Sequence, residues 1–199
     1  MPVIRAFIAI EIPKPIQEQL DVIICDLKGL TKSTAIRWIL SKNIHITLKF
    51  LGDVSISNVD LLSEMLKNEV VRYPQFKLNI DGFGAFPSLL RPRVIWIGVS
   101  TTPELQALQN GVEAETNRLG YSPEQRVFSP HLTLARLSHK ASPIEIRRVG
   151  KILSNFKVEK VGSYEVKNVI LFKSDLLPGG PIYTPISTFK LKLKSQVVQ

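Results

Sequence analysis

Two histidines, His45 and His131, each begin the same four-residue pattern, His-x-Thr-Leu, at residues 45–48 and 131–134. The chain has only three histidines, and average residue usage makes two such matches an accident about once in ten thousand. A neutral imidazole accepts a proton and an imidazolium donates one, and an unperturbed pKa of about 6.5 supplies both forms near neutrality. The repeated pattern therefore indicates a general acid and a general base.

Each pattern must lie on an element that presents the histidine and the threonine together. Both stretches are apolar and β-branched, which favours strands, and side chains along a strand alternate between its two faces. Strict alternation puts His45, Thr47 and Lys49 on one face of the first strand. In the second strand it puts His131 and Thr133 on one face. The opposite, apolar face of each strand would anchor it in a core.

The elements around the two motifs also repeat. In the first half, periodicity and capping signals predict a strand at 3–10, a helix from Pro13 to Gly29, the first motif strand, a helix capped by Ser57, and a strand at 76–83. The second half follows the same order: a strand at 94–99, a helix opened by Thr101-Thr102-Pro103-Glu104, the second motif strand, a helix capped by Ser142, and a strand at 164–172. A further strand is predicted at 182–193. A loop is expected at 87–93, and its residues 89–93 correspond in place to a loop at 176–181. A duplication of about 88 residues is too long for a solenoid. It predicts two pseudo-twofold-related lobes whose His/Thr faces line one cleft.

Composition favours one compact unit. The chain has 199 residues, 44% of them hydrophobic, and no linker divides it, so we expect a single domain over 1–199 with repeats at about 3–92 and 93–193. The net charge of +9 favours a polyanionic partner, although many basic proteins bind no nucleic acid. The stretch at 3–10 lacks the features of a signal peptide, and no apolar run has membrane-spanning length. The single cysteine, Cys25, fits a reducing cytosol, so we expect a cytoplasmic protein.

Two histidines that face each other across a basic cleft suit reaction at a phosphodiester. One takes a proton from water or a hydroxyl and the other gives a proton to the leaving oxygen. The hydroxyls of Thr47 and Thr133, two residues after each histidine, would hydrogen-bond phosphoryl oxygens and stabilise developing charge. This chemistry requires no metal.

Other interpretations of these residues remain open. A metal site lacks further ligands, because Cys25 and His139 are poorly placed and no carboxylate recurs beside both motifs. A lone strand histidine usually makes a local hydrogen bond, but its repetition with threonine favours function. Arg136 would share a face with the leucines and reach a phosphate only if the strand bends, so Arg136 and Lys49 stay outside the predicted site. The aromatic residues Trp38, Phe50 and Phe128 could stack on a base, although such residues more often pack in a core.

The motifs and their surroundings resemble the 2H phosphoesterase superfamily and, within it, the RNA 2',3'-cyclic phosphodiesterases, historically called 2'-5' RNA ligases. The resemblance covers nearly the whole chain. It is carried by residues 45–52 and 128–136, and by residues 5–10, Trp38, 93–99 and 171–183. It implies an α+β fold in which antiparallel sheets, with helices packed outside them, line a central cleft.

The resemblance also implies a reaction and its residues. The terminal 2',3'-cyclic phosphate of an RNA, from tRNA or another source, would be opened to a 2'-phosphomonoester, and the reverse reaction would form a 2'-5' linkage. His45 would be the proton donor and His131 the base, while Thr47 and Thr133 hold the phosphate. No cofactor, membrane or obligate protein partner is expected. A non-catalytic module that binds RNA or nucleotides, or a phosphodiesterase for a small cyclic nucleotide, is the alternative.

Overall fold

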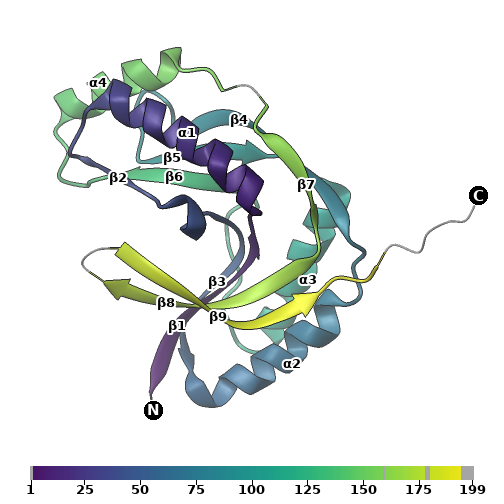
Figure 1. The fold of residues 1–199 in the computed structure, drawn as a ribbon. Helices are drawn as coiled ribbons and strands as arrows, with labels where there is room; N and C mark the ends of the chain where they lie inside the picture. The colour runs from purple at the N-terminus through teal and green to yellow at the C-terminus, as the bar shows by residue number, and fades with distance from the viewer. Residues whose placement is uncertain (1, 159, 178–179, 194–199) are drawn as a thin grey trace, which may run out of the picture.

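Two antiparallel sheets form the frame of the molecule (Figure 1). The computed structural model describes residues 2–158, 160–177 and 180–193. In this part of the chain, sheet A has the order β3-β1-β8-β9 and sheet B has the order β2-β6-β5-β4-β7. The strands of sheet A are β1 (Val3–Glu11), β3 (His45–Ser55), β8 (Asn168–Leu177) and β9 (Gly180–Lys190). Those of sheet B are β2 (Ile36–Trp38), β4 (Phe76–Phe86), β5 (Val94–Val99), β6 (His131–Leu137) and β7 (Gly162–Val166).

The helices cover the outer faces of the sheets, as the α+β prediction requires. Helices α1 (Lys14–Thr31) and α4 (Pro143–Asn155) lie beside sheet B, and α2 (Val59–Val70) and α3 (Pro103–Arg118) lie beside sheet A (Figure 1). Helix α1 follows β1 of sheet A but covers sheet B. Helix α3 follows β5 of sheet B but covers sheet A. Most buried apolar side chains therefore form one cluster that runs through both lobes, and Phe7, Ala9, Ile170 and Phe172 form a second, smaller one. Among the described residues, no helix combines the length and apolar character needed to cross a membrane.

Local capping explains where two of the helices begin. The Thr102 hydroxyl accepts a hydrogen bond from Leu105 N (3.2 Å), and the Ser142 hydroxyl accepts one from Glu145 N (3.2 Å). Each satisfies an amide that the first helical turn leaves free. The predicted caps of these helices are confirmed, with Thr102 rather than Thr101 as the residue that caps α3.

Two other helix boundaries were predicted wrongly. Ser57 lies inside a 3₁₀ turn, Ile56–Asn58, and α2 begins after that turn without a side-chain cap. Helix α1 continues past Gly29 and ends where Lys32 adopts a left-handed conformation (φ 41°). Packing of the apolar stripe of α1, down to the buried Leu27 and Thr31, outweighs the weak helix propensity of a single glycine.

The C-terminal strands also differ from the prediction. The single strand expected at 164–172 is two strands, β7 in sheet B and β8 in sheet A, and the chain crosses between the lobes at Lys167. Two exposed residues in succession, Lys167 and Asn168, interrupt the alternation at this crossing. The loop expected at 176–181 is mostly strand, with residues 178–179 outside the described part. Strand β9 ends at Lys190, before the predicted end at 193.

Gly84 provides a test of the packing in sheet B. It lies opposite Trp96 in the β4–β5 pair, where a Cβ atom would overlap the indole ring. We expect Gly84→Ala to lower the free energy of unfolding by about 1–3 kcal/mol, because the indole must move. Gly29→Ala, in open space on α1, should raise it by about 0.5–1 kcal/mol. Urea denaturation of both variants measures the difference, and equal effects would contradict this packing.

Candidate active site

A cavity of about 590 Å³ lies between the two sheets and receives side chains from both. All four predicted site residues line it: His45 and Thr47 from β3 of sheet A, and His131 and Thr133 from β6 of sheet B. The two motifs, far apart in sequence, thus share one cavity.

The two imidazoles are oriented in the same way. Nδ1 of His45 lies 2.8 Å from the Asn43 carbonyl oxygen, and Nδ1 of His131 lies 2.7 Å from the Ser129 carbonyl oxygen. Because a carbonyl oxygen only accepts hydrogen bonds, Nδ1 must carry the proton in each ring. The Nε2 atoms of both neutral rings are then free to accept a proton.

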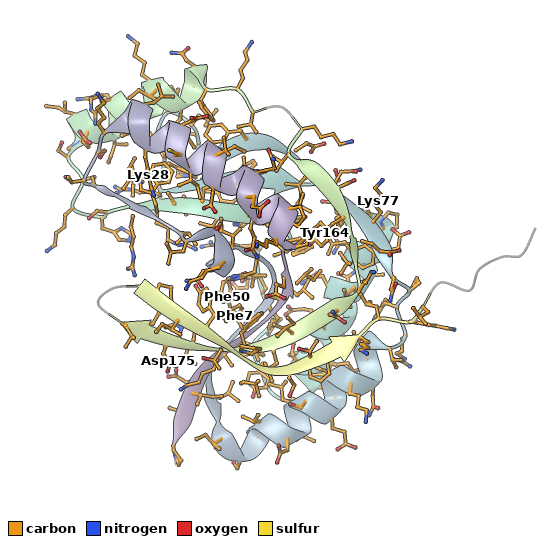
Figure 2. The ribbon with its side chains drawn as sticks, in the orientation of Figure 1. Phe7, Lys28, Phe50, Lys77, Tyr164 and Asp175 are labelled. Carbon is orange, nitrogen blue, oxygen red and sulfur yellow. The ribbon has the colours of Figure 1, made fainter. Side chains whose placement is uncertain are left out.

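Aromatic side chains hold both imidazoles in place. The His45 ring stacks on Phe7, with centroids 4.7 Å apart, and meets Tyr183 edge-on at 5.2 Å. The His131 ring lies edge-on to Phe86, with centroids 5.0 Å apart. Figure 2 shows Phe7 close to the point where the lobes meet. These contacts restrict the rotation of both rings and shield part of each ring from water.

Burial sets the protonation state of both histidines in the unliganded protein. It lowers the pKa of His45 to about 4, with the charges of Arg136 and His131 adding to this effect and the Asn43 carbonyl opposing it. Burial also lowers the pKa of His131, again with a contribution from Arg136 and with opposition from the Ser129 carbonyl. Both rings are therefore largely neutral at pH 7.

A β-bulge in the first motif strand overturns the predicted position of Lys49. Ile8 pairs with Lys49 and Ala9 pairs with Thr47, so Leu48 has no partner on β1. Residues directly opposite each other in a sheet point to the same face. Lys49 therefore points with Ile8 into the core, where only 4% of it is exposed, and the prediction that it shares the face of His45 is wrong.

The second motif strand contains the same bulge one repeat later. Ile95 pairs with Ala135 and Trp96 pairs with Thr133, which leaves Leu134 without a partner on β5. Arg136 consequently lies opposite Val94 and lines the cavity beside His131. The strand bend that would bring Arg136 to the cleft is thus present.

The matching position of the first motif carries an aromatic residue. Phe50, which stands where the second motif has Arg136, pairs with Phe7 and lines the cavity with 62% of its surface exposed. Its ring centroid lies 6.2 Å from that of Phe7 (Figure 2). Phe128 both lines the cavity and packs against the core, whereas Trp38 packs against the core and does not line the cavity. The expectation of a core role is therefore confirmed for Trp38 and wrong for Phe50.

Sequence reasoning considered Arg136 but not Arg5 or Arg37 as site residues, and the charges of all three act on Tyr183. Burial raises the pKa of the Tyr183 hydroxyl, and the charges of Arg136, Arg37 and Arg5 oppose this rise. These three arginines come from β6, β2 and β1, so only the fold brings them together. The alternation of β1, in which Arg5 shares a face with Phe7, is the signal that could have found one of them.

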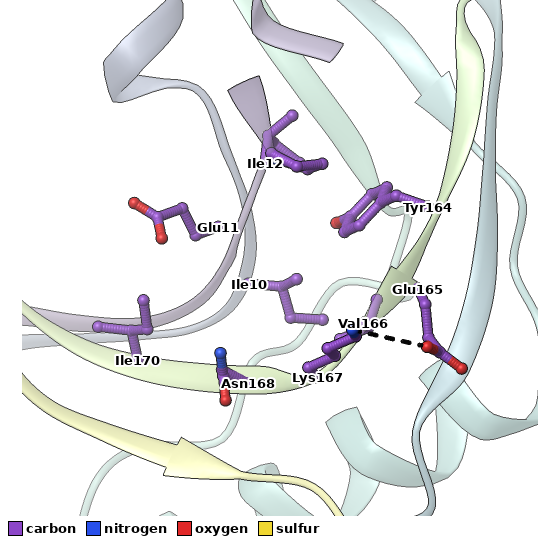
Figure 3. Close-up of a pocket in the computed structure, with 10 residues that line it drawn as sticks. Ile10, Glu11, Ile12, Tyr164, Glu165, Val166, Lys167, Asn168 and Ile170 are labelled. Atoms are coloured by element: carbon purple, nitrogen blue, oxygen red, sulfur yellow. Dashed lines mark ion pairs between the residues drawn. The ribbon is translucent and has the colours of Figure 1, made fainter. Parts of the chain in front are cut away.

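A smaller cavity of about 180 Å³ lies where β1 leaves sheet A and where β7 leads into β8 (Figure 3). Its lining includes Tyr164 and the Glu165–Lys167 pair, whose charged atoms are 4.0 Å apart, and contains no histidine. Across the described residues, no cluster of three or more histidine, cysteine, aspartate or glutamate side chains could hold a metal ion. The larger cavity is therefore the candidate active site.

Comparison with known proteins agrees with this fold and cavity. The model of the family described as LigT like Phosphoesterase matches the chain twice, at residues 10–96 and 97–183. The chain is 34% identical over 186 residues to the RNA 2',3'-cyclic phosphodiesterase of Archaeoglobus fulgidus, covering 94% of this chain and 99% of that protein. It is 32% identical to the protein of the same name from Escherichia coli K12, covering 94% and 96%.

The crystal structure of E. coli LigT complexed with 3'-AMP superposes with a TM-score of 0.72 at 30% identity, covering 96% of this chain and 99% of that chain. These matches confirm the resemblance read from the two motifs, and the chain belongs to the LigT-like (2H) phosphoesterase family.

Proposed function

We propose that this protein hydrolyses the terminal 2',3'-cyclic phosphate of an RNA to a 2'-phosphomonoester. The observation that carries the proposal is the pair of neutral imidazoles, one from each sheet, that line one cavity with Nδ1 bound to a backbone carbonyl and Nε2 free. General acid–base catalysis needs two such groups, one on each side of the reacting phosphorus.

In the proposed reaction, His131 Nε2 takes a proton from water as the water oxygen attacks phosphorus. The bond between phosphorus and the 3' oxygen breaks, and protonated His45 gives its Nε2 proton to that oxygen. The 2' oxygen stays on phosphorus, so the products are a 2'-phosphate and a 3'-hydroxyl. Proton exchange with solvent restores both rings. The same sequence of steps, with an RNA 5'-hydroxyl in place of water, would form a 2'-5' linkage.

Polar residues of the cavity would bind the phosphate. The hydroxyls of Thr47 and Thr133, on the same strand faces as the histidines, donate hydrogen bonds to its non-bridging oxygens and stabilise charge in the transition state. The guanidinium of Arg136 supplies a bidentate cationic partner. Exposed Phe50, which lies on β3 whereas Arg136 lies on β6, offers a surface on which the terminal base stacks. The chemistry passes through no metal.

The related proteins support this choice of substrate. Relatives at 30–36% identity, which span most of the chain, bear the name RNA 2',3'-cyclic phosphodiesterase. E. coli LigT has been crystallised with 3'-AMP and with phosphate. A net charge of +9 suits a polyanionic substrate, whose affinity falls as salt concentration rises.

The first experiment is single replacement of each histidine. We expect His45→Ala and His131→Ala each to lower kcat by roughly 10²–10⁴-fold, because each removes one half of the proton transfer. The measurement uses a short RNA with a 2',3'-cyclic phosphate end in excess chelator, and the product end is identified.

His139→Ala, which removes the histidine outside the motifs, is the matched control and should retain full activity. An active His45 or His131 variant would contradict the mechanism. A 3'-phosphate product would contradict the proposed bond cleavage. Binding of the RNA without any product from the unmodified protein would support a binding module instead, and turnover of cyclic mononucleotides alone would point to a small substrate.

A substrate with sulfur in place of the bridging 3' oxygen tests the individual roles of the histidines. A thiolate leaves without protonation, so loss of the general acid matters little for this substrate. We expect the sulfur to restore about 10²-fold or more of the activity lost in His45→Ala, the size of a general-acid contribution. It should not restore activity in His131→Ala. The opposite pattern of rescue would show that the roles are exchanged.

The pH dependence of kcat/KM follows from the lowered pKa values. The proposed reaction requires that His45 and His131 together carry one added proton. The pH dependence of kcat/KM reports the titration of these groups in the free enzyme. Because burial holds both pKa values below their usual 6.5, His45 at about 4, protons are lost as the pH rises through the acid range. We expect kcat/KM to fall about tenfold per pH unit above pH 7. A rate that increases between pH 6 and 8 would contradict this assignment.

A further inference from the structure

A buried ion pair lies beside the active site and takes no part in the proposed reaction. Lys49 Nζ of β3 lies 2.6 Å from Glu113 Oε1 of α3; the lysine side chain is 3% exposed and the glutamate side chain 20%, with its Oε2 atom buried. Nζ also donates a hydrogen bond to the Ser122 carbonyl (2.6 Å), and Glu113 Oε1 accepts one from Glu124 N (2.8 Å). Both members of the pair thus bond to the backbone of residues 121–130, the segment between α3 and β6.

This segment forms part of the cavity wall although it contains no helix or strand. Its cavity-lining residues are Glu124, Arg126, Val127, Phe128 and Ser129. The Ser129 carbonyl also orients His131. The position of the segment therefore affects both the space for substrate and a proposed catalytic group.

Few backbone hydrogen bonds hold the segment in place. In the described part of the chain, backbone-to-backbone bonds join it to its surroundings only near its ends, from Tyr121 N to the Thr116 carbonyl and from Val99 N to the Pro130 carbonyl. Between these points the attachment to β3 and α3 comes from the side chains of Lys49 and Glu113. A segment with so few bonds depends strongly on each one.

Comparison of the two repeats shows what the ion pair replaces. The motifs are 86 residues apart (131 − 45), so residues 122–124 correspond to β2, whose Trp38 pairs with Ala135 of β6. Ala135 corresponds to Lys49. In the described residues, β3 is the edge strand of sheet A and has no equivalent of β2 beside it. Hydrogen bonds from the side chains of Lys49 and Glu113 are found where, in the other lobe, β2 forms backbone hydrogen bonds to β6.

We propose that Lys49 and Glu113 are a positioning pair that fixes residues 121–130 as a wall of the cleft and thereby promotes binding of the RNA end. Burial of two charges is costly, and an apolar pair often stabilises a fold equally well. The ion pair differs from an apolar pair in binding one backbone carbonyl and one backbone amide at once. For its kinetic readout the inference rests on the proposed function.

The test compares Lys49→Met with the double variant Lys49→Met/Glu113→Gln. The single variant leaves a buried carboxylate without its cation and can fail to fold, whereas the double variant removes both charges. With the segment released, trypsin should cleave the folded protein after Arg126 at least about tenfold faster. KM for the cyclic-phosphate RNA should rise about tenfold while kcat changes less than about threefold, because the bond from Val99 N to the Pro130 carbonyl still holds the end of the segment that orients His131 and the loss is mainly one of binding.

Glu69→Gln is the matched control. Glu69 is a buried carboxylate on α2 that bonds to Arg72 and Tyr73, with no hydrogen bond to the segment. Its variant should keep the original cleavage rate after Arg126 and the original KM. Unchanged cleavage and KM in the double variant would overturn the inference, as would faster cleavage with unchanged KM. If the unmodified protein hydrolyses no cyclic phosphate, the proposed function fails, whereas cleavage after Arg126 still decides whether the pair holds the segment.

Discussion

The unopposed leucine in each motif strand determines what the two lobes present to the cleft. At Leu48 and again at Leu134 the strand gains one residue relative to its partner, so the face that follows is inverted. The histidine and threonine before the leucine point into the cleft. The residue just after it points into the core, and the next one points back into the cleft. One backbone irregularity, present in both motif strands, therefore determines which of the residues after the leucine face the cleft.

The same irregularity makes a symmetric frame chemically asymmetric. At the inverted cleft position, one lobe presents the aromatic ring of Phe50 and the other presents the guanidinium of Arg136. At the inverted core position, the lobes carry Lys49 and Ala135. A nucleotide end has an apolar base on one side of its sugar and an anionic phosphate on the other. A cleft with an aromatic wall and a cationic wall complements such a group in a way that two identical walls would not.

The sequence predicts the existence and order of most elements, because apolar periodicity and helix caps are local signals. It also predicts that the motif histidines and threonines share a cleft, because duplication implies symmetry. Strict alternation fails after Leu48 and Leu134. The apolar pattern of the second strand does shift there, since buried Ala135 and Leu137 are out of step with Leu132, and this shift is a readable bulge signal. The effect of the Arg37 charge on Tyr183 depends on tertiary structure alone, as does the crossing at Lys167 that divides one apolar run between two sheets.

Burial of the imidazoles connects the fold to the proposed chemistry. The aromatic contacts that hold His45 also shield it from much of its water, and this partial desolvation favours the neutral ring near pH 7. An anionic phosphate entering the cleft opposes that effect, because a negative charge beside an imidazole in a poorly solvated site favours the protonated form. Binding of the substrate would thus promote protonation of His45, the general acid of the proposed reaction.

The exchange of α1 and α3 between lobes gives the two sheets a common core, so the two walls that hold the imidazoles are parts of one packed structure. Such preorganised groups stabilise developing charge without first having to reorient.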